Sequence, residues 1–457
     1  MRKQNLSLFE AVKKALYEYD MLPDGENAVV AVSGGADGMA LLHCLARLRP
    51  GKISGAHVQH GIRGASAVQD MEFVAGYCKA HGIPLRVFEV DVPLYAKQNG
   101  IGIEQAAREL RYSCLDEAMV EAGASCIAVG HHMDDQAETM LMHLMRGGGP
   151  AGLMGMRPVS GNIIRPMLFA GKADILEYCR ENGIPFVTDE TNYDTEYTRN
   201  AIRHRLMPEL MKFNPGITAA LQRTSLLMAR DNDCLEKLAL EVKVDIAFGE
   251  VRIKYDVLDA LHIAVASRVV IRALAAIGLD KDVEMRHIEA VFDMPRRAGA
   301  SVDIVRGYIA AAGYGELILT QRKDIGKVSV PLICPGDTRL GGVVIRAEVI
   351  DSAPEDFKTH GAYVEYFDFN SFPKDAVFRN RRDGDWMRLL GSGTKKLKDY
   401  LSDAKIERHI RDRLPVIASG GEILWIIGIG SSGNYRVEGN TQKVLKIVAS
   451  GNKILAL

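Results

Sequence analysis

Six consecutive residues near the N-terminus have the composition of a loop that binds phosphate. They are Ser33, Gly34, Gly35, Ala36, Asp37 and Gly38. The loop follows an apolar run at 28–32 and precedes a helical pattern that begins near residue 39. Adjacent glycines let a backbone approach an anion closely, and the first turn of a helix offers unpaired N–H groups and a partial positive charge. The segment therefore predicts a binding site for a pyrophosphate group.

Two common phosphate-loop patterns do not fit this segment. It matches neither G-x-x-x-x-G-K-[ST] nor the dinucleotide pattern G-x-G-x-x-G. The acidic residue inside the loop instead suggests that Asp37 holds a magnesium ion that bridges the phosphates. The alternative is a strand-to-helix turn whose glycine pair binds nothing.

A second polar cluster follows the apolar run 126–129 and opens a helical pattern at 134–145. On an ideal helix His131, Asp135 and Glu138 lie within about 60° of one another, and the apolar side chains occupy a separate arc. An imidazole beside two carboxylates suits magnesium binding, recognition of a cation or proton transfer equally well. The alternative is structural, because acidic residues in the first turn of a helix complement the helix dipole.

Two arginines lie three residues apart on the helical pattern at 104–121. Arg108 and Arg111 therefore share one face of that helix. Their guanidinium groups could neutralise the α-phosphate of a nucleotide while it is displaced. A solvated helix surface explains the same spacing without any ligand.

The alternation of strand and helix patterns places these groups in one fold class. Apolar runs at 28–32, 53–58, 85–90 and 126–129 alternate with helical patterns at 39–47, 67–80, 104–121 and 134–145. This order is typical of an α/β domain with a parallel, doubly wound sheet that has helices on both faces. Parallel sheets bind ligands at the carboxyl ends of their strands, so the loop and the acidic cluster should meet there.

Changes of pattern divide the rest of the chain. After Pro166 the periodicity is helical, and from Ser301 onward short strand patterns alternate with glycine-rich turns. We predict an α/β domain at 1–215, a mostly helical domain at 216–330, a linker or strand region at 331–370 and a smaller α+β domain at 371–457.

Composition excludes several classes of protein. The 457 residues are 47% hydrophobic and 25% charged, which excludes general disorder. The longest apolar run, 423–429, is far shorter than the roughly 20 residues that cross a bilayer, and the N-terminus lacks a signal-peptide pattern. We therefore expect a cytoplasmic protein without a membrane segment. Seven scattered cysteines without a C-x-x-C pair argue against a disulfide framework and a thiolate zinc site.

The net charge of −1 conceals a basic segment near the C-terminus. Residues 371–415 contain twelve Lys or Arg against seven Asp or Glu, a surplus of five positive charges. Such a surplus suits contacts with RNA phosphates, and a solvated charged surface is the alternative. A second basic group at 199–205 could hold an RNA stem in the same way. The predicted RNA-contacting residues are Arg199, Arg203, Arg205, Arg381, Arg382, Lys395, Lys396 and Lys398.

These motifs occur in the order known from one protein family. The loop is followed by HGIRG at 60–64, AAR at 106–108 with RY at 111–112, and GHHMDDQAET at 130–139. Further matches lie at 146–149, 379–385 and 395–399. In this order the sequence resembles the N-type PP-loop ATP pyrophosphatases, and within them it looks most like the tRNA(Ile)-lysidine ligases.

The resemblance implies an adenine nucleotide α-hydrolase-like fold and an ATP-dependent ligase reaction. Such an enzyme adenylates the C2 oxygen of the wobble cytidine in the CAU anticodon of tRNA(Ile), and pyrophosphate leaves. Free L-lysine then displaces AMP and forms lysidine. The resemblance also implies ATP and Mg²⁺ as the ligands of the loop, and a homodimer is compatible with it.

The same resemblance assigns roles to the candidate residues. Asp37 would hold the magnesium ion beside the pyrophosphate cradle. Arg108 and Arg111 would stabilise negative charge near the α-phosphate. The remaining three, which would serve the lysine and the metal, are His131, Asp135 and Glu138.

One position of the loop departs from the family pattern. Gly38 stands where serine is usual, so a hydroxyl that would donate to a phosphate oxygen is missing. We expect weaker nucleotide binding or slower adenylation, by about 1–3 kcal/mol, and the same reaction. Gln59 and Ala201 likewise replace the more usual Asp and Arg.

Three other functions use parts of the same pattern. A tRNA thiolase built on this loop would need a cysteine pair or cluster that handles sulfur. An NAD or GMP synthetase would not need the basic C-terminal segment. An RNA-binding protein with a decayed loop is favoured by Gly38 alone. Release of pyrophosphate that requires both lysine and a CAU-anticodon tRNA distinguishes the lysidine reaction from all three.

Overall fold

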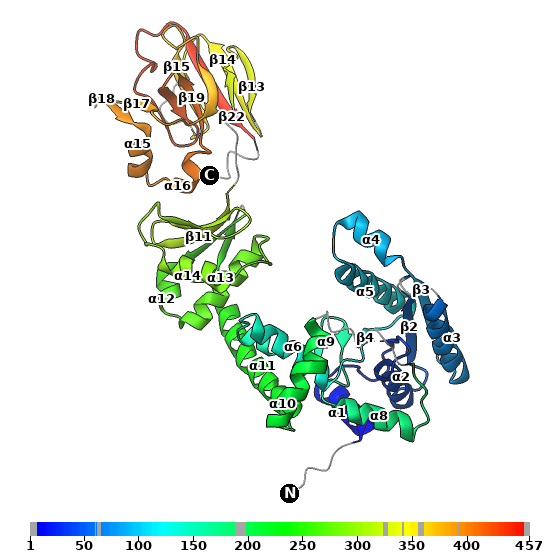
Figure 1. Cartoon of the computed structure of the whole chain (residues 1–457). Helices are drawn as coiled ribbons and strands as arrows, with labels where there is room; N and C mark the ends of the chain where they lie inside the picture. Colours follow the sequence, from blue (N-terminus) through cyan, green and yellow to red (C-terminus); the bar gives the residue numbers. More distant parts are fainter. Residues whose placement is uncertain are drawn as a thin grey trace. The chain divides into compact units, whose positions relative to one another are not determined.

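The computed structural model describes residues 7–59, 61, 65–187, 198–247, 249–322, 328–340, 342–354, 361–391 and 393–451. Contacts divide the chain into two compact units, Met1–Cys234 and Leu235–Leu457, which are described separately (Figure 1). Within the described ranges, no helix has a stretch long and apolar enough to cross a membrane. All seven cysteines are free thiols.

The first unit contains the predicted α/β domain and the helices that follow it. Its elements are α1 (Leu8–Glu18), β1 (Ala28–Ala31), α2 (Ala36–Leu48), β2 (Ile53–Gln59), α3 (Ala65–Ala80), β3 (Leu85–Glu89), α4 (Val92–Asn99), α5 (Ile103–Glu121), β4 (Cys126–Ala128), α6 (Met133–Met145), α7 (Pro150–Leu153), β5 (Val159–Ser160), β6 (Ile163–Ile164), α8 (Lys172–Glu181), α9 (Thr198–Ala201), the π-helix η2 (Ile202–Leu206), α10 (Met207–Phe213) and α11 (Ile217–Glu241), which continues into the second unit.

A six-stranded sheet forms the centre of this unit, in the order β3-β2-β1-β4-β6-β5. Strands β3, β2, β1, β4 and β6 are parallel, and β5 pairs with β6 in the antiparallel direction. The chain therefore builds outward from β1 to β3 on one side and continues with β4 on the other. The predicted doubly wound parallel sheet is confirmed, and the point where the strand order reverses lies between β1 and β4.

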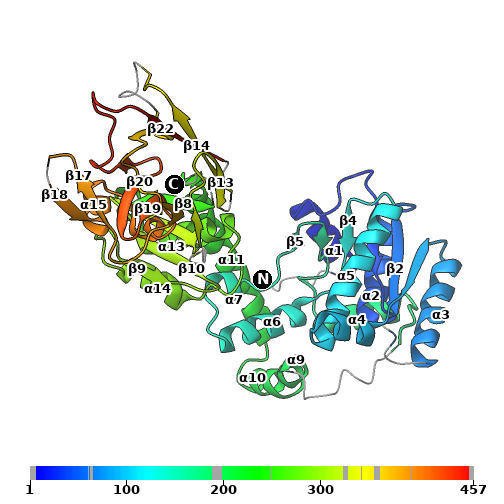
Figure 2. The same cartoon turned by 90° about the horizontal axis from the view of Figure 1, so that it is seen from above.

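Side chains of β1 alternate between two hydrophobic cores, which explains why helices cover both faces of the sheet. Ala28 and Val30 pack in a core with buried residues of α1, α2, α3 and α8. Val29 and Ala31 pack on the opposite face with buried residues of α5. Both views show α3 and α5 on opposite sides of β2 (Figures 1 and 2). Successive side chains of a strand point to opposite faces of the sheet. Because both faces are buried here, all residues of β1 are apolar and the strand appears in the sequence as one continuous apolar run.

The second unit holds two further sheet-containing regions. Its elements are β7 (Asp245–Ala247), β8 (Glu250–Lys254), α12 (Tyr255–Asp259), α13 (Ile263–Ala276), α14 (Met285–Asp293), β9 (Ser301–Asp303), β10 (Tyr308–Ala312), β11 (Glu316–Gln321), β12 (Ser329–Pro331), β13 (Gly336–Leu340), β14 (Val343–Ile350), β15 (Val364–Asp368), β16 (Val377–Asn380), β17 (Trp386–Leu389), β18 (Gly393–Lys396), α15 (Leu397–Asp403), α16 (Arg408–Arg411), β19 (Pro415–Ser419), β20 (Glu422–Ile426), β21 (Gly430–Ser431) and β22 (Val444–Ser450).

The strands of this unit are not confined to the α+β domain predicted at 371–457. A five-stranded sheet, β7-β8-β11-β10-β9, packs with α13 and α14 around one core. The segment 331–370, expected as a linker or strand region, contributes β13, β14 and β15 to a four-stranded sheet with β22. These strands share a core with β16, β19 and β20 of the neighbouring sheet, so the C-terminal fold begins near residue 329.

Candidate active site

The predicted phosphate loop joins β1 to α2 in the geometry that an anion site requires. Gly34 has φ +89°, a left-handed conformation that side chains rarely adopt, and its carbonyl accepts a hydrogen bond from the Val187 N–H at 3.0 Å. Gly35 caps α2, which begins at Ala36, so the loop leads directly into the helix N-terminus. The backbone therefore presents N–H groups where the sequence predicts a pyrophosphate.

The end of β4 comes very close to this loop. A Cβ placed on Gly130 would lie 3.1 Å from the carbonyl carbon of Asp37 and 3.3 Å from its Cβ. A side chain at this position would therefore require the segment after β4 and the first turn of α2 to move apart by a few tenths of an ångström. Glycine at the switch point allows the acidic cluster to approach the phosphate loop, as the parallel topology predicts.

Asp37 is paired with a lysine that the sequence analysis did not identify. The Lys172 ammonium at the first turn of α8 lies 2.6 Å from Asp37 Oδ1. His132 Nε2 lies 3.8 Å from the other carboxylate oxygen of Asp37. Lys172 lies eight residues beyond the end of β6, a parallel strand that ends at the same edge of the sheet, and that position is the signal that could have identified it.

His132 is the histidine that faces the acidic residues. Its ring nitrogens lie 3.4 Å from carboxylate oxygens of Asp134 and Asp135. Burial alone would lower the pKa of His132, but these carboxylates and Asp37 outweigh burial and raise it. His132 therefore carries a positive charge more readily than a free histidine. The sequence analysis selected its neighbour His131 instead.

His131 precedes α6, which begins at Met133, so the helical angle used for its prediction does not apply to it. Burial lowers its pKa to about 4, Asp135 opposes this shift, and Arg165 and Arg111 add to it. The Arg165 side chain donates to Nδ1 at 3.3 Å. Because Nδ1 accepts this hydrogen bond, the proton of the neutral ring resides on Nε2. His131 is thus a neutral hydrogen-bond donor at neutral pH.

Asp135 and Glu138 lie together on α6 and are paired with arginine. Arg203 Nε donates to Glu138 Oε1 at 2.6 Å, and its terminal nitrogen donates to Asp135 Oδ1 at 3.0 Å. Arg199 Nε lies 3.3 Å from Glu138 Oε2. The side chain of Glu138 is only 2% exposed, so it needs such partners. The arginines lie on α9 and the π-helix η2, a rare helix type that is frequent at functional sites.

The charges around Asp135 keep this carboxyl group ionised. Burial acts to raise its pKa, but the charge of His132, the hydrogen bond from the His132 N–H and the charge of Arg199 outweigh burial and lower it. The carboxylate is therefore available to attract a cation at neutral pH.

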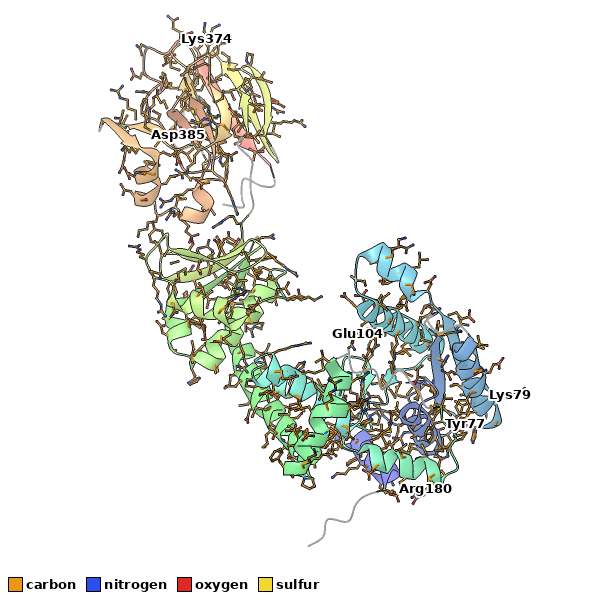
Figure 3. The ribbon with its side chains drawn as sticks, in the orientation of Figure 1. Tyr77, Lys79, Glu104, Arg180, Lys374 and Asp385 are labelled. Carbon is orange, nitrogen blue, oxygen red and sulfur yellow. The ribbon has the colours of Figure 1, made fainter. Side chains whose placement is uncertain are left out.

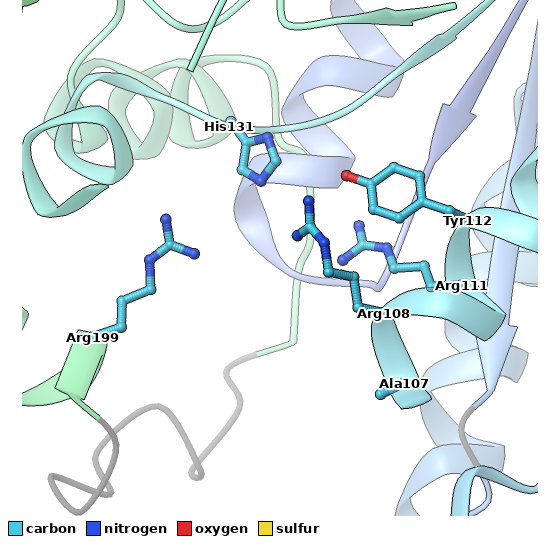
Figure 4. A pocket seen from close by; sticks show the side chains of 6 residues that line it. All are labelled: Ala107, Arg108, Arg111, Tyr112, His131 and Arg199. Atoms are coloured by element: carbon cyan, nitrogen blue, oxygen red, sulfur yellow. The ribbon is translucent and has the colours of Figure 1, made fainter. Parts of the chain in front are cut away.

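Arg108 and Arg111 lie beside His131, as Figure 4 shows. Both arginines and Tyr112 extend from α5 toward the imidazole, and Arg199 faces it from the other side. The Arg108 guanidinium stacks over the Tyr112 ring at 5.1 Å. These groups line a pocket of about 210 Å³. Its positive charges suit a phosphate or another electron-rich group.

A larger cavity of about 1540 Å³ joins the loop to the acidic helix. It is lined by residues from the ends of β1 and β2, from the loop between β1 and α2, and from α5, α6, α8, α9, η2 and α10. The volume exceeds the 300–1,000 Å³ common for small-ligand sites, so it can hold more than one substrate. The polar and charged residues that line the cavity include Ser33, Asp37, His57, Arg111, Glu138, Lys172 and Arg203.

The residues beside the loop suit magnesium better than a transition metal. The described part of the chain contains no group of three or more His, Cys, Asp or Glu residues arranged to hold a metal ion. Magnesium commonly takes one or two carboxylates and completes its shell with water and substrate phosphates. Asp37 lies in the loop, and His132 contacts both Asp37 and Asp134. These two carboxylates fit that requirement.

The predicted RNA-contacting residues differ in their exposure and in the contacts that they make. Arg199 and Arg203 contact the acidic helix, whereas Arg205 is exposed. In the second unit, Arg381 pairs with Asp412 at 2.6 Å and Lys395 pairs with Asp403. The exposed members of the predicted C-terminal set are Arg382, Lys396 and Lys398.

A buried ion pair fixes the turn that carries Arg381 and Arg382. Arg379 is fully buried and donates twice to Asp385, with both distances 2.8 Å. Figure 3 labels Asp385. Asp385 also accepts from the Arg382 N–H at 2.7 Å. Because breaking a buried pair is strongly unfavourable, this turn has a defined conformation.

His60 and residues 62–64 of the HGIRG motif lie outside the described residues. A family model described as a PP-loop domain matches residues 7–210, and a model described as the TilS substrate C-terminal domain matches residues 377–448. The parallel sheet, the loop and the matching model define the first unit as a PP-loop ATP-binding protein.

Full-length relatives identify the particular family. The tRNA(Ile)-lysidine synthase of Caldanaerobacter subterraneus subsp. tengcongensis is 34% identical over 460 residues, with 98% of each chain covered. That of Clostridium tetani is 32% identical over 467 residues, covering 98% of this chain and 99% of the relative. The chain belongs to the tRNA(Ile)-lysidine synthase family. A crystal structure of a TILS C-terminal domain is 30% identical, covers 28% of this chain and 98% of that chain, and gives a TM-score of 0.25.

Proposed function

We propose that this chain adenylates the C2 oxygen of the wobble cytidine in the CAU anticodon of tRNA(Ile) and joins L-lysine to C2, with release of pyrophosphate and then AMP. The observation that carries the proposal is one cavity at the carboxyl edge of the sheet that joins a phosphate loop, an arginine group and an acidic helix. Each of the three substrates needs one of these environments. Relatives of the same length carry the name of this activity.

The first step is the transfer of AMP to the base. The loop at 33–38 and the start of α2 would hold the β- and γ-phosphates, and Arg108 and Arg111 would stabilise charge at the α-phosphate. A magnesium ion, when bound at Asp37, would neutralise phosphate charge. His131 would donate its Nε2 proton in a hydrogen bond to the base or the α-phosphate, because its pKa of about 4 keeps it neutral.

The second step is the attack of lysine on C2. A lysine enters with a charged ε-ammonium group, which must lose a proton before its nitrogen can attack. Asp135 and Glu138 would attract this ammonium and accept the proton. Arg203 donates hydrogen bonds to both carboxylates before the cation arrives, and burial raises the pKa of Glu138 despite this contact. AMP then leaves with the electron pair of the C2–O bond.

The tRNA would contact both units. Arg205 in the first unit and Arg382, Lys396 and Lys398 in the second are exposed cations that suit phosphate contacts. An anticodon loop presents unstacked bases, so the wobble cytidine can enter the cavity at low energetic cost. We place the reaction in the cytoplasm, where tRNA, ATP and lysine meet, and a homodimer stays a prediction that analytical ultracentrifugation can test.

The test is a reconstituted reaction with a matched tRNA control. The purified chain is incubated with ATP, Mg²⁺, isotopically labelled lysine and a CAU-anticodon tRNA(Ile), and the nucleosides are analysed by mass spectrometry. We expect lysidine, AMP and pyrophosphate, and no product with a tRNA that carries uridine in place of the wobble cytidine. Formation of ADP and phosphate, or pyrophosphate release that needs no tRNA, would refute the proposal.

A further inference from the structure

Lys172 is held in place by contacts that the proposed reaction does not explain. It is the first residue of α8, and its backbone N–H donates to Asp134 Oδ2 at 2.9 Å. The preceding Gly171 N–H donates to Asp174 at 3.0 Å, and the Ala170 carbonyl accepts from the Met133 N–H at 2.9 Å. The start of α8 is thus fixed to the start of α6, so the Lys172 side chain projects from a defined point.

The ammonium group of Lys172 lies at the phosphate loop and reaches the cavity. It is 2.6 Å from Asp37 Oδ1, the side chain is 41% exposed, and it lines the same cavity as Ser33, Gly35 and Asp37. A partly exposed ion pair contributes little to stability. Stability is therefore a weak reason for this lysine to be here.

The charge of the surroundings gives a stronger reason. Asp37, Asp134 and Asp135 place three carboxyl groups beside the loop that is to receive a polyphosphate. The loop 33–38 itself contains no lysine or arginine. Lys172 reaches it from a position 135 residues later in the chain and brings a compact positive charge within hydrogen-bond distance of the loop's own carboxylate.

We propose that Lys172 is a phosphate-binding residue of the adenylation step. In the absence of nucleotide its ammonium neutralises Asp37. When ATP binds, the ammonium contacts an oxygen of the β- or γ-phosphate, and Asp37 becomes available to a metal ion. As the bond between the α-phosphorus and the bridging oxygen breaks, pyrophosphate takes the electron pair, and Lys172 stabilises that charge without giving up its proton. This inference rests on the proposed nucleotide site.

Pyrophosphate binding in the presence of EDTA tests the proposal without turnover and without metal. Inorganic pyrophosphate is titrated into the full-length chain by calorimetry. We expect Lys172→Met to bind at least tenfold more weakly than the unchanged chain, because a charged contact is lost. Lys172→Arg, which keeps the charge, should recover most of this affinity. Lys14→Met is the control, since Lys14 lies on α1 in an exposed pair with Glu18, and we expect a change below twofold.

A double-variant comparison separates a direct contact from simple neutralisation. If Lys172 contacts phosphate, Lys172→Met should weaken binding at least tenfold also in a chain that carries Asp37→Asn. If the loss disappears in the Asp37→Asn background, Lys172 acts only as the counter-ion of Asp37 and the proposal is wrong. Equal affinity of Lys172→Met and the unchanged chain would also overturn it. If the unchanged chain bound neither pyrophosphate nor ATP, the proposed nucleotide site itself would be refuted.

Discussion

The residue at position 38 determines how strongly the loop can hold a nucleotide. A Cβ placed on Gly38 would lie 3.4 Å from the Ala31 carbonyl oxygen and from the Val32 Cα, which is ordinary contact. We therefore expect Gly38→Ser to fold normally and to bind ATP more tightly by about 1–3 kcal/mol, through one added hydrogen bond to a charged group. Equilibrium binding of an ATP analogue and the rate of AMP formation measure the effect. Gly38→Ala adds the Cβ without the hydroxyl, and an equal gain in that variant would contradict the explanation.

The adjacent histidines should affect stability in opposite directions as the pH changes. The pKa of His131 is lowered to about 4, so its contribution is present above the unfolded-state value near 6.5 and is lost as the pH falls toward 4. The pKa of His132 is raised, so its contribution is present below 6.5 and is lost as the pH rises through the folded-state pKa.

Two substitutions test this difference. His131→Asn should remove up to roughly 3 kcal/mol of the acid-dependent loss in the free energy of unfolding between pH 6.5 and 4. His132→Asn should not change the loss in the free energy of unfolding between pH 6.5 and 4. It should instead remove the loss that occurs as the pH rises through the folded-state pKa of His132. Denaturant unfolding measured across this pH range gives both quantities. Parallel pH profiles for the two variants would show that the local charges do not act as described.

At the scale of elements, the contact between the end of β4 and the phosphate loop sets the geometry of the site. Gly130→Ala would place its Cβ 3.1 Å from the Asp37 carbonyl carbon, which requires a backbone shift. We expect ATP affinity to fall at least tenfold while the domain stays folded, because small displacements at a binding site are costly. Gly76→Ala on α3 is the control, since an added Cβ there meets nothing within 4 Å. Unchanged affinity in Gly130→Ala would show that the loop does not depend on this contact.

The elements themselves were largely predictable, whereas their side-chain partners were not. The four strands and four helices predicted for the first sheet occur within three residues of the expected bounds, because buried parallel strands read as short apolar runs. The phosphate loop was identified from its glycines and position. The pairing of Asp37 with Lys172, and of Glu138 with Arg203, joins residues 65 or more positions apart, and no local pattern indicates such contacts.

The same limit explains why the sequence could not assign partners to the two adjacent histidines. His131 was grouped with Asp135 and Glu138 by helical spacing, but α6 begins only at Met133. His132 precedes the helix in an extended conformation, and in this segment His131 contacts Arg165 whereas His132 lies among the carboxylates. That residues 331–370 belong to the C-terminal fold could not be predicted for another reason, since β14 pairs with β22, about 100 residues later.

At the scale of the whole molecule, the basic residues of the second unit should control the affinity for tRNA. Lys396 and Lys398 are exposed at the start of α15, whereas Lys395 is paired with Asp403. A lysine already paired with a carboxylate releases fewer counter-ions on binding RNA, because part of its charge is neutralised in the free protein. We therefore expect the three lysines, although close in sequence, to contribute unequally.

Binding of the CAU-anticodon tRNA(Ile) at several salt concentrations measures these contributions. The double variant Lys396→Ala and Lys398→Ala should weaken binding and reduce the slope of log affinity against log salt by about 1 for each lysine. Lys395→Ala should change the slope less. Lys374→Ala is a matched control, because Lys374 is exposed in the same domain but lies far from α15 in the view of Figure 3. If the slope is unchanged in the double variant, or if Lys374→Ala reduces it equally, then Lys396 and Lys398 do not contact the tRNA. The exposed Arg205 of the first unit is then the next candidate.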